Sequence, residues 1–147
     1  MRHLEVSAVL PASAQVAWAA LIDVEQWPNW GRLVVSAEGE FTPGHRWTMD
    51  VRGDAVSRIM RPYFLSMIPG RQLVFETRLG ASWLVNMRHW FDLTEEGPDR
   101  SLLTQRWEVT GLFVRPLWSQ IEPGILQFDQ LGTDLADHLR KAPSPTA

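Results

Sequence analysis

The order of the predicted elements constrains the fold of this chain more than any single motif does. A strand over residues 2–10 ends at Pro11, and a short helical pair follows as far as Trp30. Residues 33–111 alternate polar and apolar side chains between turn signals, and a long helix is expected over about residues 115–141. Antiparallel strands between two helical ends can curl around the last helix and leave a cavity, which usually holds a small apolar molecule. The order therefore predicts an α+β protein with a binding cavity.

Composition limits the classes of protein and of site. The chain has 147 residues, of which 45% are hydrophobic and 21% are charged, so it can form one core and is too apolar for general disorder. Its net charge of −3 gives no electrostatic reason to expect nucleic acid as a partner. Cysteine is absent, which excludes disulfides and thiol nucleophiles, and the histidines lack the spacing of metal ligands. We expect neither a metal nor a cofactor.

No segment is predicted to target the chain or to anchor it. Residues 1–6 alternate polar and apolar side chains, whereas a signal peptide carries a continuous apolar block. No stretch approaches the ~20 apolar residues that span a bilayer. We expect a cytoplasmic protein without membrane insertion, with a single domain over residues 1–141 and a flexible tail over residues 142–147.

Both helical regions carry start and stop signals. Ser13 can cap a helix over Ala14–Ile22, because its hydroxyl can accept a bond from an otherwise unpaired amide. Asp23 is a candidate cap for a second, very short helix, which Pro28 keeps from extending. The last helix has apolar residues at intervals of three and four, and this stripe must face the sheet. Pro123-Gly124 lies inside it and predicts a kink or a break.

The strand region is expected to form an antiparallel meander. Turn signals such as Gly53-Asp54 and Pro69-Gly70 divide it into six strands, so that about seven are expected in all. Trp90 is an exception to the alternation, because it is a large apolar residue on the outward parity. It is predicted either to cover a neighbouring strand or to mark a patch of weak self-association. We therefore expect a monomer or a weak homodimer.

Five short patterns carry a family resemblance: Val16-Ala17-Trp18 leading to Asp23, Trp27-Pro28-Asn29-Trp30, Pro69-Gly70-Arg71-Gln72-Leu73, His89-Trp90-Phe91-Asp92-Leu93 and Glu108-Val109-Thr110-Gly111-Leu112. In this order they resemble the START-like, or SRPBCC, superfamily, and most closely its small bacterial polyketide cyclase/dehydrase-like members. The resemblance implies a helix-grip fold, in which a curved antiparallel sheet wraps around a long C-terminal helix. It also implies a hydrophobic cavity between them. It does not imply one activity, because the fold hosts carriers, enzymes and cochaperone domains.

The predicted ligand-binding residues occupy inward strand positions and the stripe of the last helix: Trp47, Met49, Phe64, Phe75, Thr77, Trp83, Met87, His89, Phe91, Gln105, Trp107, Trp118, Ile121, Ile125 and Phe128. Walls of Trp, Phe and Met suit a flat, aromatic or polycyclic ligand.

His89 is the candidate catalytic residue, because it alone among the histidines lies on a strongly inward strand face. A general acid or base needs a positioned substrate proton and a pKa near the working pH. Thr77 and Gln105 could share its face and orient its ring or a ligand carbonyl. The alternative is a core histidine whose ring is satisfied by a neighbour. Tyr63, the sole tyrosine, could reach a ligand oxygen from the rim.

Three functions remain open at this point. The first is binding of a small hydrophobic molecule, which the apolar inward faces favour. The second is a cyclase or dehydratase that uses the same cavity, with His89 as its acid or base. Because no second acid or base is predicted on an inward face, the enzyme hypothesis is less favoured than the binding hypothesis. The third is an interaction module similar to the chaperone-activating members of the superfamily.

Overall fold

The computed structural model of the chain describes residues 1–81 and 83–141, and the predicted tail lies outside these ranges. The elements in chain order are β1 (Arg2–Leu10), α1 (Ala14–Ile22), a 3-10 turn (Val24–Gln26), α2 (Trp27–Trp30), β2 (Val34–Gly39), β3 (Trp47–Arg52), β4 (Ser57–Met60), β5 (Tyr63–Ile68), β6 (Gln72–Arg78), β7 (Asn86–Gly97), β8 (Arg100–Thr110), α3 (Val114–Leu126) and α4 (Asp129–Lys141). The α+β helix-grip prediction is confirmed, with eight strands in place of about seven.

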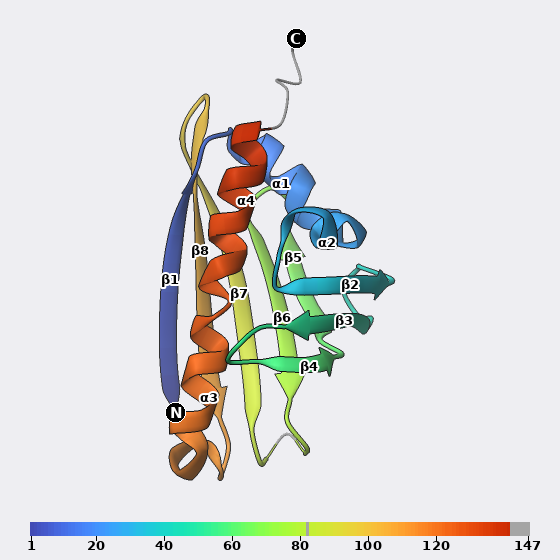
Figure 1. Ribbon diagram of the computed structural model, residues 1–147, viewed down its shortest axis with the longest axis vertical. Helices are drawn as coiled ribbons and strands as arrows, with labels where there is room; N and C mark the ends of the chain where they lie inside the picture. The colour runs from blue at the N-terminus through green and yellow to red at the C-terminus, as the bar shows by residue number, and fades with distance from the viewer. Residues whose placement is uncertain (82, 142–147) are drawn as a thin grey trace.

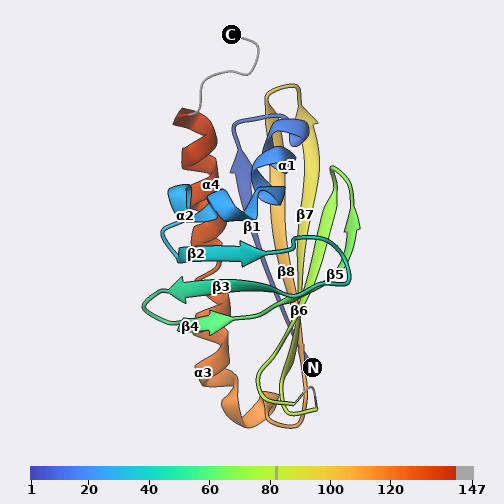
Figure 2. The same ribbon diagram turned by 90° about the vertical axis from the view of Figure 1, so that its right-hand side faces the viewer.

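The strands form two antiparallel sheets. The larger has the order β1-β8-β7-β6-β5, and the smaller has the order β2-β3-β4 (Figure 1). The strands of the small sheet run across the direction of the long ones (Figure 2). The eighth strand arises because Pro62, which has no amide donor, separates β4 from β5. A single bridge between Arg46 and Tyr63 links the two sheets at this point.

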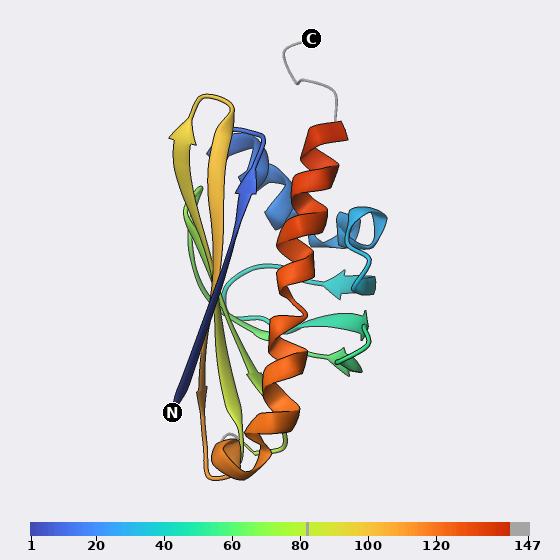
Figure 3. The same cartoon turned by 60° about the vertical axis from the view of Figure 1, so that its left-hand side comes forward.

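The helices α3 and α4 run along one face of the large sheet (Figure 3). The predicted break is present, but it lies at residues 127–128 and not at Pro123-Gly124. The helix continues through the proline and then tightens, since the Phe128 amide donates to Ile125 (3.0 Å). Gly124 is needed for packing rather than for the break: a Cβ there would lie 3.3 Å from the carbonyl oxygen of Ala55 in the β3–β4 hairpin.

The clasp formed by α1 and α2 follows the sequence signals in part. The Ser13 hydroxyl accepts a bond from the Val16 amide (3.2 Å), as predicted. Asp23 makes no side-chain cap bond. Pro28 lies inside the first turn of α2, where its missing amide costs nothing. Trp27 anchors the clasp, because its buried indole donates to the Leu21 carbonyl (3.1 Å).

An aromatic cluster joins the two sheets. The rings of Phe41, Phe64 and Phe75 lie 4.8–5.6 Å apart between centroids, and Trp47 contacts Phe75 at 5.6 Å in an edge-on arrangement. Such edge-on pairs stabilise a core beyond the effect of burial alone. The cluster therefore packs residues of the two sheets against each other.

On the outer face of the large sheet, Trp90 is covered from within the chain. The Arg106 guanidinium lies 5.0 Å above its ring, and the Arg106 Nε donates to Asp92 (2.6 Å). Asp92 also accepts a bond from Gln72 (2.7 Å). Trp90 is consequently half-buried under a neighbouring strand, and its role in self-association remains a prediction.

Candidate ligand-binding site

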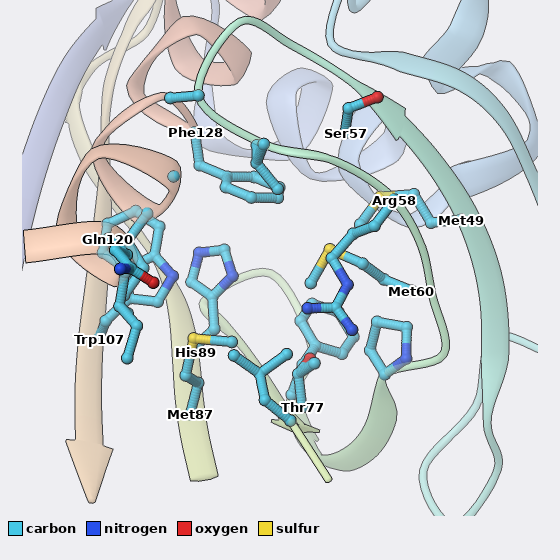
Figure 4. A pocket seen from close by; sticks show the side chains of 18 of the residues that line it. Met49, Ser57, Arg58, Met60, Thr77, Met87, His89, Trp107, Gln120 and Phe128 are labelled. Atoms are coloured by element: carbon cyan, nitrogen blue, oxygen red, sulfur yellow. The ribbon is translucent and has the colours of Figure 1, made fainter. Parts of the chain in front are cut away.

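A cavity of about 360 Å³ lies between the large sheet, the small sheet and α3 (Figure 4). Most of the predicted residues line it: Trp47, Met49, Phe75, Thr77, Met87, His89, Phe91 and Trp107 from the strands, and Ile121, Ile125 and Phe128 from α3 and the break that follows it. Its wall is therefore mostly apolar, and it includes several aromatic rings and methionines.

Four predicted residues lie outside the cavity wall: Phe64, Trp83, Gln105 and Trp118. Phe64 is fully buried in the aromatic cluster. The Trp118 indole donates to Glu122 on the same helix (3.1 Å), and the Arg2 guanidinium of β1 lies 5.4 Å from its ring. Gln105 is buried behind the wall, and it reaches the cavity only through His89. No structural finding supports ligand contact by Phe64 or Trp118.

The prediction that Trp83 lies on an inward strand face is wrong. Its side chain is 62% exposed, and β7 begins only at Asn86. The loop before β7 is bonded to the turn after β8, where the Leu112 amide donates to the Trp83 carbonyl (2.9 Å). Gly111, at a φ of +129°, permits this approach, because a Cβ there would lie 2.3 Å from the Leu84 carbonyl oxygen. The inward and outward alternation of β7 does not reach residue 83, because a turn lies between this residue and the strand.

Several lining residues were missed by the sequence analysis. Leu117 and Gly124 lie one turn from Ile121 on α3, and Gln120 lies one turn from both of them, so helical spacing could have found all three. Trp27 of the clasp was not among the predicted ligand-binding residues, yet it also borders the cavity. Leu79, which follows β6, also lines the cavity. The remaining missed residues come from the β3–β4 hairpin, from β4 and from Pro62: Ala55, Val56, Ser57, Arg58, Met60 and Pro62. The proline made the strand register of these six residues impossible to assign from the sequence.

The His89 ring is fixed on the cavity wall by its neighbours. It stacks on Trp107, its cross-strand partner, at 4.3 Å and 21°, and it lies 4.4 Å from the ring of Phe91. Its Nε2 lies 3.1 Å from the Oε1 atom of Gln105, and the Gln105 amide donates to the Phe128 carbonyl (3.0 Å). The predicted partnership with Gln105 is present. Thr77 lines the same cavity, but the structure records no bond between it and His89.

Burial lowers the pKa of His89 to about 3, although the hydrogen bond to Gln105 opposes the shift. Desolvation disfavours the charged imidazolium, and no carboxylate is paired with the ring among the described residues. The imidazole is therefore neutral near pH 7. In this state it can accept or donate a hydrogen bond, but it cannot supply a positive charge to a ligand.

Arg58 adds a positively charged group to the cavity, in contrast to the neutral imidazole of His89. Its side chain reaches inward from β4, on the side facing His89 (Figure 4). No ion pair of Arg58 is present within residues 1–81 and 83–141. A guanidinium is always charged and only donates hydrogen bonds. The cavity thus combines an apolar wall with a neutral imidazole on one side and a cation on the other.

Tyr63 does not border the cavity; it lies at the bridge to Arg46, whose guanidinium is 5.9 Å from its ring. Within the described part of the chain, no group of three or more His, Asp or Glu side chains is placed to hold a metal ion. No helix there is long and apolar enough to cross a membrane.

Residues 1–127 match the model of the family described as polyketide cyclase / dehydrase and lipid transport. The chain belongs to this family. The family resemblance seen in the sequence is thereby confirmed, and the description of the family includes both cyclisation chemistry and lipid transport. Family membership supports a role in binding hydrophobic ligands or in cyclisation, without naming a ligand. Among curated proteins, none matches this sequence.

Solved structures share the fold of this family member at low sequence identity. A START superfamily protein from Mycobacterium smegmatis aligns with a TM-score of 0.72 and 16% identity over 95% of this chain and 97% of that one. An aromatase/cyclase from a Streptomyces species aligns with a TM-score of 0.74 and 12% identity over 99% of this chain and 98% of that one. Norcoclaurine synthase from Thalictrum flavum, in complex with dopamine and hydroxybenzaldehyde, aligns with a TM-score of 0.72 and 13% identity over 97% of this chain and 88% of that one. At these identities the likeness concerns the fold alone.

Proposed function

We propose that this protein binds a small, flat, mainly apolar molecule with an aromatic ring in the cavity between its sheets and α3. The observation that carries this proposal is the cavity itself, at about 360 Å³, with walls of aromatic rings and methionines. This volume falls in the range of small-molecule sites, which are lined mostly by apolar side chains with a few polar groups that orient the ligand.

The wall chemistry supports an aromatic ligand in particular. Aromatic rings pack in offset or edge-on arrangements at centroid distances of ~5–6 Å. Trp27, Trp47 and Trp107 present ring surface to the cavity, and Met49 and Met87 add polarisable side chains that adapt to a ring edge. Among the structural neighbours, one is named an aromatase/cyclase, and norcoclaurine synthase is in complex with the aromatic molecules dopamine and hydroxybenzaldehyde.

Fluorescence titration with 2-naphthol tests this proposal, because three tryptophans border the cavity and their emission should change when a ring binds beside them. A Met87→Arg variant should lose most of this response, since Met87 is 9% exposed and an arginine there would fill the cavity. Met67→Arg is the matched control, because Met67 lies outside the cavity on β5 and is 37% exposed. Equal affinity in folded wild type and Met87→Arg would refute binding in the cavity.

A second candidate function is cyclisation or dehydration in the same cavity, and the position of His89 favours it. An enzyme of this type holds a flexible substrate in a reactive conformation, which by itself can supply much of the rate. A neutral imidazole can accept a proton from such a substrate. The low pKa makes it a weak base, so positioning by the cavity would carry most of the effect. Turnover of a β-polyketone surrogate that survives intact in His89→Gln would remove His89 from this mechanism.

The interaction-module alternative has no observation in its favour. It would fit a tightly packed interior, whereas the interior contains the cavity.

A further inference from the structure

The side-chain amide of Gln105 has only one possible orientation. Its Nε2 lies 3.0 Å from the Phe128 carbonyl oxygen, which lies at the break between α3 and α4. A carbonyl oxygen only accepts hydrogen bonds, so the atom facing it must be the amide nitrogen. The same carbonyl also accepts the Leu131 amide (3.0 Å), and a flipped Gln105 would place two oxygens against each other. The Gln105 oxygen therefore faces His89.

This orientation determines which nitrogen of His89 carries the proton. The Gln105 Oε1 atom, 3.1 Å from Nε2, can only accept, so Nε2 must be the N–H donor. A neutral imidazole has one ring proton, which leaves Nδ1 as an acceptor with a free lone pair. Nδ1 has no hydrogen-bond partner among the described residues. Figure 4 shows a ring edge of His89 turned toward the open centre of the cavity.

The surroundings keep the ring in this orientation. Trp107 stacks on it at 4.3 Å and Phe91 lies at 4.4 Å, and both are buried. A rotation of the ring by 180° would break the bond to Gln105 and replace the nitrogen there with carbon. The acceptor atom is thus held in place by two strands and by the helix break.

We propose that Gln105 is a positioning residue, which fixes His89 as the Nε2–H tautomer so that the cavity selects flat aromatic ligands carrying a hydroxyl or N–H donor. This inference rests on the proposed binding function and narrows its ligand class. A bound ring without a donor would keep water away from Nδ1 and offer no hydrogen bond in its place, which costs free energy. Arg58, which only donates, cannot take the place of an acceptor for that hydroxyl.

Three probes of similar size measure the selection: 2-naphthol, naphthalene and 2-methoxynaphthalene. In the wild type, 2-naphthol should bind about tenfold to hundredfold more tightly than 2-methoxynaphthalene, whose oxygen cannot donate. In Gln105→Leu this preference should fall several-fold, while the affinity for naphthalene stays near that of wild type. Gln15→Leu, on the exposed face of α1, is the matched control and should keep the full preference.

A second measurement needs neither ligand nor variant. Nitrogen-15 NMR of the unliganded wild type separates protonated from unprotonated ring nitrogens, and it should report Nε2–H and a bare Nδ1 for His89. An Nδ1–H tautomer, or equal affinities for 2-naphthol and 2-methoxynaphthalene in the wild type, would overturn the inference. If none of the three probes binds, the proposed function fails for this ligand class, whereas the NMR result still decides the role of Gln105.

Discussion

Two buried polar side chains tie the C-terminal helices to the rest of the molecule, and they differ in how completely they are paired. Asp134 on α4 is 4% exposed and accepts three bonds from Arg32: from the backbone amide (2.9 Å), from Nε (3.1 Å) and from Nη2 (3.0 Å). Gln105 joins the break at Phe128 to His89, whose Nδ1 is left open to the cavity.

The difference separates a structural site from a binding site. A buried polar group is stable when it is hydrogen-bonded within the protein, as the Asp134 carboxylate is to Arg32; this pair is called the Asp134–Arg32 clamp. An acceptor left open on a cavity wall can be satisfied only by a ligand or by water. Substitutions at the clamp should therefore change stability, and changes at Gln105 or His89 should change ligand selection.

The largest expected effect comes from opening the clamp. Asp134→Ala removes three bonds, and the part-buried Arg32 backbone amide loses its acceptor, so the free energy of unfolding should fall by ~1–3 kcal/mol. Chemical denaturation measures this loss. Asp137→Ala, at an exposed pair with Arg140 on the same helix, is the control and should cost less than ~0.5 kcal/mol. An equal loss of stability in both variants would mean that the clamp contributes no more than an exposed ion pair. Both variants should keep the preference for 2-naphthol.

Per pH unit, a smaller change in stability is expected when the pH is lowered and His89 is the titrating group. The pKa of His89 is lowered to about 3, whereas an unfolded histidine has a pKa of ~6.5. Both states are neutral above pH ~6.5; below it, the unfolded state binds the proton first, and stability falls until the pH approaches 3. The wild type should therefore lose about 1 kcal/mol per pH unit more than His89→Gln over this window.

The pH experiment compares slopes, so that carboxylates titrating in both proteins cancel. Denaturation curves at several values between pH 4 and pH 7 provide the slopes, and His3→Gln, altered at an exposed position of β1, should keep the wild-type slope. Parallel slopes for the wild type and His89→Gln would mean that the His89 ring titrates normally and is not desolvated by the cavity wall.

The smallest effect is expected on the outer face of the large sheet, which offers a third kind of polar site. Arg106 is 41% exposed in its side chain, and it covers Trp90 while it pairs with Asp92. Because solvent screens this pair, Arg106→Ala should reduce the free energy of unfolding by less than ~1 kcal/mol, as measured by denaturation. A loss as large as that of Asp134→Ala would show that exposure does not separate these sites.

The strand wall of the cavity was predictable because its pattern is local. Alternation along β7 and β8 placed His89, Phe91 and Trp107 on one face, and the structure brings these three rings together. The same rule failed at Trp83, because a turn precedes β7 and alternation has no meaning through a turn. The alternation of inward and outward side chains therefore predicts orientation only for residues within the strand itself.

The opposite wall depends on features that a periodic pattern does not contain. Arg58 follows a hairpin and precedes Pro62, so the proline hid its parity, and its approach to the cavity depends on how the small sheet crosses the large one. Gln105 was expected on the cavity wall, but it lies behind His89 because the helix breaks at Phe128 and offers a carbonyl there. The proline in the sequence predicted this break about four residues too early.

A crystal structure of the wild type with 2-naphthol would locate both the bound ring and its hydroxyl. We expect the naphthalene ring between Trp107 and Met49, with the hydroxyl oxygen at ~2.7–3.0 Å from the Nδ1 atom of His89. A ring bound outside the cavity would contradict the proposed function. A ring inside the cavity with its hydroxyl turned away from His89 would contradict the selection attributed to Gln105.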